Sequence, residues 1–156
     1  MRIVSFLAVL AIGAISIALP TSARAQQAAA DIEFIGSRPN RALADAVRVG
    51  NTIYLSGKLG TAPGQGLVDG GIEPETRQTM ENIKSALEGM GATMDDVVKC
   101  TVFLADMAEW GAMNGVYTTY FTKHKPARSA VGVNGLAINA RVEIECIAVI
   151  GARNAG

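Results

Sequence analysis

Two segments of helical pattern, each placed between segments of strand pattern, are the feature that most limits the fold of this chain. In 75–90 apolar residues recur every three or four positions, as they do in an amphipathic helix. A second helical pattern covers 108–121. Strands joined through a helix are too distant in sequence to form a hairpin, so we expect a sheet in which helices make the crossovers.

The segments of strand pattern fix the order of elements. The first two, 44–49 and 52–56, flank Gly50-Asn51, a dipeptide typical of the two-residue turn of a β-hairpin. The remaining strands are expected at 97–104, 128–133 and 142–150. The predicted order is ββαβαββ. Right-handed crossovers would place both helices on one face of a single mixed sheet, which gives an α/β domain with one uncovered sheet face.

The last strand indicates what each sheet face carries. Its uniformly apolar set, suited to packing against helices, is Val142, Ile144, Cys146 and Ala148. The alternate set, expected on the open face, is Glu143, Glu145, Ile147 and Val149. A face that mixes charged and apolar side chains favours an oligomer, because the apolar ones would otherwise stay exposed.

The two cysteines, Cys100 and Cys146, each alternate with apolar residues along a strand. We therefore expect each to be a small apolar residue on the covered face, without a disulfide. A disulfide remains the less favoured alternative, because it requires the two strands to be neighbours in the right register. His124 is the only histidine, so neither a zinc site nor a Ser-His-Asp triad is expected.

The first 25 residues have the composition of a cleavable signal peptide. Met1-Arg2 gives a positive start, 3–19 is apolar, and the segment ends in Ala-x-Ala, which predicts cleavage after Ala25. A flexible tail over 26–31 would follow, and the mature protein would be secreted or periplasmic, with no stable membrane association. The alternative is an uncleaved membrane anchor, since the apolar run nearly spans a bilayer.

The charge balance limits the possible partners. The full chain has 14 basic and 14 acidic side chains, and loss of Arg2 and Arg24 with the leader would make the mature domain slightly acidic. A nucleic acid held through its phosphates requires a basic stripe. We therefore expect no nucleic-acid partner.

Arg128 and Glu143 are charged residues inside mostly apolar strand segments that follow one another. Burying an unpaired guanidinium or carboxylate is costly, so we expect these two to pair across neighbouring strands or to meet a ligand. They are the first candidates for a functional site.

Several short segments, at matching order and spacing, together resemble the RidA/YjgF family of enamine/imine deaminases. They are 49–51, 55–57, 79–83, 98–104, 126–129 and 142–145, with Asn114 and Tyr117. The resemblance covers the domain 32–156 and implies a chorismate-mutase-like fold assembled as a homotrimer, with sites between subunits. It also implies hydrolysis of 2-aminoacrylate and related 2-imino acids to 2-keto acids and ammonia, without a cofactor or a metal.

In the family's scheme Arg128 binds the substrate carboxylate and Glu143 handles the attacking water. The planar guanidinium suits the first role, because it can bind a carboxylate bidentately. Imine hydrolysis also requires proton transfer to the departing amine, and one carboxylate alternating between base and acid suits the second role. The resemblance thus implies Arg128 and Glu143 as the catalytic pair.

Four further residues would complete the substrate site by the same resemblance. Gly57 and the backbone of Ala130 would contact the substrate, together with Ser56 and Asn114. For Ser56 and Asn114, hydrogen bonding at a strand end and on a helix face are equally open alternatives.

Three positions depart from the family's pattern: Leu43, Lys58 and Ala130, the last where many deaminases have a cysteine. No thiol chemistry is expected at Ala130, and the substrate preference stays open. The changed lining supports a second hypothesis, a non-catalytic trimer of the same family that captures small carboxylates. Ribonuclease or chaperone activity is a third hypothesis, and the lack of a basic aromatic patch counts against an RNA partner.

Overall fold

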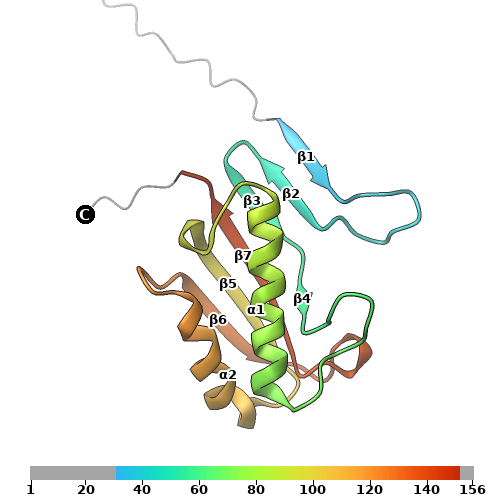
Figure 1. Ribbon diagram of the computed structural model, residues 1–156, viewed down its shortest axis with the longest axis vertical. Helices are drawn as coiled ribbons and strands as arrows, with labels where there is room; N and C mark the ends of the chain where they lie inside the picture. The colour runs from blue at the N-terminus through green and yellow to red at the C-terminus, as the bar shows by residue number, and fades with distance from the viewer. Residues whose placement is uncertain (1–30, 152–156) are drawn as a thin grey trace, which may run out of the picture.

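The computed structural model describes residues 31–151, so the expected signal peptide and nearly all of the tail over 26–31 lie outside the described residues. The described part folds as one sheet covered on one face by two helices, α1 (Ile72–Gly89) and α2 (Trp110–Tyr117), which lie side by side (Figure 1). The strands are β1 (Ile32–Ile35), β2 (Ala46–Val49), β3 (Thr52–Leu55), β4 (Lys58–Leu59), β5 (Val97–Leu104), β6 (Ala127–Gly132) and β7 (Val142–Val149). The predicted single mixed sheet with both helices on one face is confirmed.

The order of strands in the sheet is β1-β2-β3-β7-β5-β6, and β4 pairs with β7. Only β5 and β6 are parallel, while every other pair is antiparallel. The predicted hairpin at Gly50-Asn51 joins β2 to β3, and Gly50 takes the positive φ of 57° that this turn requires. The last strand in the sequence therefore lies in the middle of the sheet.

Two strands were not expected, and both are short or weakly patterned. β1 carries Ile32 and Phe34 at the surface, so it has no covered set of apolar residues to reveal it. β4 has only two residues and lies in a glycine-rich segment. The second helix is also shorter than the predicted 108–121, because tight helical turns at Met107–Glu109 and Thr118–Tyr120 occupy its two ends.

The predicted alternation of β7 is confirmed. The buried set is Val142, Ile144, Cys146 and Ala148, each exposed by no more than 1%. The alternate residues are more exposed and lie on the face that the helices leave open. On α1 the buried apolar residues are Ile72, Met80, Ile83 and Leu87, so the predicted apolar stripe packs against the sheet. Within residues 31–151, neither helix is long and apolar enough to cross a membrane.

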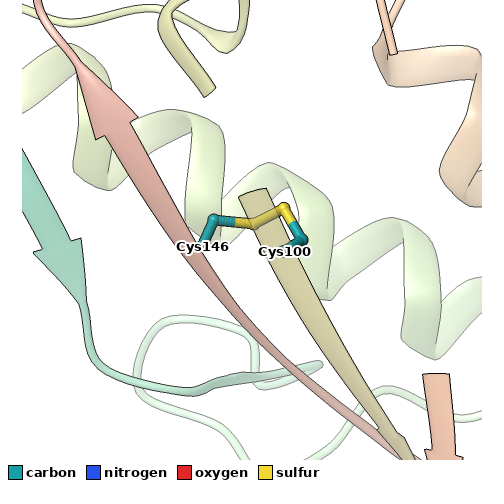
Figure 2. The surroundings of a disulfide bond; sticks show 2 residues. All are labelled: Cys100 and Cys146. Atoms are coloured by element: carbon teal, nitrogen blue, oxygen red, sulfur yellow. A yellow bond between two sulfur atoms is a disulfide. The ribbon is translucent and has the colours of Figure 1, made fainter. Parts of the chain in front are cut away.

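Cys100 and Cys146 form a disulfide, so the expectation of two unpaired cysteines was wrong (Figure 2). β5 and β7 are antiparallel neighbours with Cys100 directly opposite Cys146, and the two Cα atoms lie 4.1 Å apart. Both residues do lie on the covered face, at 0% and 1% exposure. The prediction failed because adjacency follows from β7 entering the sheet between β3 and β5, which the order along the chain does not reveal.

Candidate functional site

Arg128 and Glu143 lie on opposite faces of the sheet. On β6, Arg128 is opposite Cys100 of β5, whereas Glu143 of β7 is opposite Phe103. Cys100 and Phe103 are three residues apart on one strand, so their side chains point to opposite faces. β5 also separates β6 from β7. Of the two alternatives that the sequence left open, the structure therefore excludes pairing of the arginine with the glutamate within one chain.

Arg128 is half-buried against α2, and its contacts are with neutral groups. Its Nη1 donates a hydrogen bond to Oδ1 of Asn114 at 2.8 Å. The guanidinium carbon lies 5.6 Å from the ring centre of Trp110 and 4.7 Å from that of Tyr117. No Asp or Glu oxygen of the described residues lies within 4.0 Å of this guanidinium. Its charge is thus free to meet a carboxylate from outside the domain.

Tyr117 supports this arrangement from the core. Its side chain is 3% exposed, it packs on Phe121 with ring centres 4.9 Å apart, and its hydroxyl has no hydrogen-bond partner among the described residues. Burial raises the pKa of Tyr117 to about 12, although the positive charge of Arg128 works in the opposite direction. The phenol is therefore neutral at physiological pH and offers Arg128 only its ring face.

Asn114 lies beside Arg128. Its amide oxygen accepts a hydrogen bond from Arg128, so the structure brings these two predicted site residues together. Ala130 lies two residues after Arg128, opposite Val102, and therefore shares its face. β6 is the last strand in the sheet order, so one row of its backbone groups has no strand partner within residues 31–151.

Glu143 lies beside Gly57 on the other side of the sheet. A Cβ atom at position 57 would overlap with the Glu143 carboxylate, so any larger residue there would displace the Glu143 side chain from this position. Ser56 donates its hydroxyl hydrogen to the carbonyl of Ala44 at 2.7 Å, which is hydrogen bonding at a strand end. The predicted site residues therefore form two groups, one around Arg128 with Asn114 and Ala130, the other around Glu143 with Gly57 and Ser56.

The two other positions that depart from the family's pattern adjoin the second group: Lys58 follows Gly57, and Leu43 precedes Ala44, whose carbonyl accepts the hydrogen bond from Ser56. Leu43 is 56% exposed. Lys58 is opposite Ile144 on β7, one residue away from Glu143 and therefore on the other face. Burial lowers the pKa of Lys58, although the nearby Asp45 works in the opposite direction.

One residue near the site was not predicted. Glu75 of α1 is 3% exposed, and its Oε1 accepts hydrogen bonds from the backbone amides of Arg141 at 2.7 Å and Val142 at 3.2 Å. It thereby fixes the start of β7 immediately before Glu143. The helical period contained the signal, because Glu75 precedes the buried Thr79 by four positions and Ile83 by eight.

Comparison with known proteins gives a consistent result. Residues 36–150 match the family model described as endoribonuclease L-PSP. The chain is 47% identical over 107 residues to the 2-iminobutanoate/2-iminopropanoate deaminase of Mus musculus, an alignment that covers 68% of this chain and 79% of the mouse protein.

Two solved structures show the same architecture. RidA from an Antarctic Psychrobacter is 36% identical with a TM-score of 0.70, and the match covers 76% of this chain and 99% of that one. E. coli TdcF with bound serine is 30% identical with a TM-score of 0.66, and the match covers 76% and 96%. The likeness thus extends to sequence and fold together.

Proposed function

The chain belongs to the endoribonuclease L-PSP family, also called the YjgF/RidA family, with its chorismate-mutase-like fold, and from this premise we propose that it hydrolyses small reactive 2-imino and enamine acids. The products would be 2-keto acids and ammonia. Members of the family are named 2-iminobutanoate/2-iminopropanoate deaminases. The observation that carries the proposal is Arg128, a half-buried guanidinium with no carboxylate partner in residues 31–151.

In the proposed reaction Arg128 binds the substrate carboxylate and Glu143 serves as base and then acid. Glu143 takes a proton from water as the oxygen forms a bond to the imine carbon. It returns that proton to the nitrogen, which gives a carbinolamine. It then takes the proton of the new hydroxyl group and passes it to the nitrogen, so that the C–N bond breaks, the C2 carbonyl forms and ammonia leaves. No electrons are exchanged with a cofactor. Gly57 and the backbone of Ala130 would line the substrate, as would Asn114 beside Arg128.

A site that uses both residues requires a second copy of the chain, because Arg128 and Glu143 lie on opposite faces of one sheet. We propose a homotrimer whose sites combine Arg128 of one subunit with Glu143 of the next. The open face supports this assembly, since Tyr54 and Val131 are 47% and 42% exposed there. In a monomer these side chains would stay in water.

We propose an exported location, secreted or periplasmic, with the leader removed after Ala25. The disulfide between Cys100 and Cys146 supports it, because such bonds persist in oxidising compartments and are rare in the cytosol. The substrate would then arise outside the cytoplasm.

A trapping assay tests the activity. An amino-acid oxidase with catalase produces 2-iminopropanoate from alanine, and semicarbazide competes with hydrolysis for the imine. Active mature protein should lower the trapped fraction, and Arg128→Ala should lose about 100-fold in kcat/KM, since a charge-assisted bidentate contact contributes a few kcal/mol. If wild type leaves the trapped fraction at the buffer value, or Arg128→Ala matches wild type, the proposal fails.

Subunit mixing tests the shared site. Arg128→Ala and Glu143→Gln should each be inactive alone. When they are co-expressed, some interfaces would combine an intact Arg128 with an intact Glu143, and activity should return. A site contained within one chain would give no recovery, since every chain then carries one defect.

The second candidate is a trimer that binds small carboxylates without turnover. The changed lining at Leu43, Lys58 and Ala130 favours it. Calorimetry with pyruvate beside the trapping assay separates the two, because binding without acceleration supports this candidate and acceleration excludes it.

A further inference from the structure

The side chains that hold Arg128 share one property, the absence of charge. The guanidinium is contacted by one amide oxygen and two aromatic rings, all from α2. An arginine that serves only to hold a helix on a sheet is more effectively paired with a carboxylate, which gives a charge-assisted bond on both sides. Elsewhere in this domain arginines do pair in that way, Arg41 with Asp45 and Arg141 with Glu109.

The three contacting residues follow one face of α2. Trp110, Asn114 and Tyr117 are spaced by four and then three positions, so they lie above one another on the helix. Tyr117 is buried, whereas Trp110 is 39% exposed, so the row extends from the core to the surface. An aromatic ring face attracts the cation from above its plane. The N–H groups of the guanidinium lie in that plane, so the rings leave them free to donate hydrogen bonds to another acceptor.

We propose that Trp110, Asn114 and Tyr117 are positioning residues that hold the Arg128 guanidinium without neutralising it. The inference rests on the proposed function, in which Arg128 binds the substrate carboxylate. Arginine has five N–H donors, and Asn114 is the acceptor for one of them. The others remain free within the described residues, and the substrate meets a charge that is already oriented.

Asn114→Asp is the decisive substitution because it changes the charge and almost nothing else. Aspartate has nearly the shape of asparagine and would keep the hydrogen bond to Arg128. The new carboxylate would pair with Arg128 and compete with the pyruvate carboxylate for it. If the neutral contact matters, Asn114→Asp should weaken pyruvate binding by about tenfold or more, and by more than Asn114→Ala does.

Pyruvate binding by the native oligomer is the assay, since it does not depend on turnover. Trp110 is the only tryptophan of the chain, so pyruvate bound near Arg128 should change the tryptophan fluorescence. Variants that lack Trp110 have no such signal, and calorimetry measures their pyruvate binding instead. Trp110→Leu should weaken binding by about tenfold and Trp110→Phe should recover part of the loss. Gly115→Ala is the control, because a Cβ there meets no atom within 4 Å and the residue lies on the same helix.

The outcomes separate the inference from the proposed function. Weaker binding in both Asn114→Asp and Asn114→Ala at an unchanged melting temperature supports the inference, since a residue that only joins α2 to β6 would change the melting temperature and not the binding. If Asn114→Asp binds pyruvate as tightly as wild type while Arg128→Ala does not bind, the inference alone is overturned. If Arg128→Ala binds as tightly as wild type, the assigned role of Arg128 fails and both are overturned.

Discussion

Breaking the disulfide between Cys100 and Cys146 should lower the stability of this domain by about 4 kcal/mol. The two residues are separated by 46 positions. In the chain-entropy treatment, a cross-link that closes a loop of this length removes about 13 cal/mol/K from the unfolded state, which gives roughly 4 kcal/mol at 25 °C. For a domain of this size the melting temperature should fall by roughly 10–20 °C.

The assay compares oxidised and reduced wild type with the Cys100→Ala/Cys146→Ala double variant at one protein concentration. Fixed concentration matters because the melting temperature of the proposed trimer would depend on it. Reduced wild type keeps both sulfur atoms in the core, so its shift reports the cross-link alone. The double variant also loses the buried sulfurs and should unfold at a still lower temperature.

Burial adds a kinetic expectation. Since the half-cystines are 0% and 1% exposed, dithiothreitol should reduce them slowly in the folded protein and rapidly in urea. Thiol counting over time measures both rates. Two results would refute this prediction. One is two free thiols in native protein that has just been denatured, and the other is a free energy of unfolding of the reduced form within about 1 kcal/mol of that of the oxidised form.

Three further predictions follow from single side chains. Tyr117→Phe removes a buried hydroxyl that has no hydrogen-bond partner among the described residues. The free energy of unfolding in urea should therefore stay the same or rise by up to about 1 kcal/mol. A decrease larger than that would contradict the absence of a partner. Glu75→Ala should lower the free energy of unfolding by roughly 2–5 kcal/mol, because two backbone amides lose their acceptor. Glu75→Gln keeps an oxygen there and should lower it less. Equal decreases in the two variants would argue against the role of Glu75 as an acceptor for these amides. Arg41 lowers the pKa of Asp45 by donating to its carboxylate, so this pair stabilises the fold above the ordinary carboxyl pKa and loses that effect as the pH falls through the lowered value. In Arg41→Ala an NMR titration should find the pKa of Asp45 higher than in wild type, and an unchanged value would count against the pair.

Much of the fold could be predicted because its elements have clear periods. Alternation along 142–149 correctly assigned every residue of β7 to a face, and the period of three to four positions on α1 identified its buried stripe. Gly50-Asn51 identified the hairpin through a backbone conformation that few residues adopt. These signals are local, so a single sequence contains them.

What could not be predicted depends on which strands become neighbours. The disulfide requires β7 to lie beside β5, and the separation of Arg128 from Glu143 requires β5 to lie between β6 and β7. Several sheet orders are compatible with the order ββαβαββ, and the choice among them is made by packing of the whole domain. No local pattern distinguishes them.

The sheet face on which Arg128 lies could not be predicted for a different reason. In β6 the residues on the side of Arg128 include Ala130, and those on the other side are Ala127, Ser129 and Val131, so neither set is uniformly apolar. Alternation assigns a face only where one set clearly belongs in the core, as in β7. An edge strand that places a charge beside a helix and an apolar residue at the surface lacks that contrast. A long strand whose composition does not reveal its faces, in a chain where β7 reveals both of its faces, is itself a reason to examine that strand for a functional site.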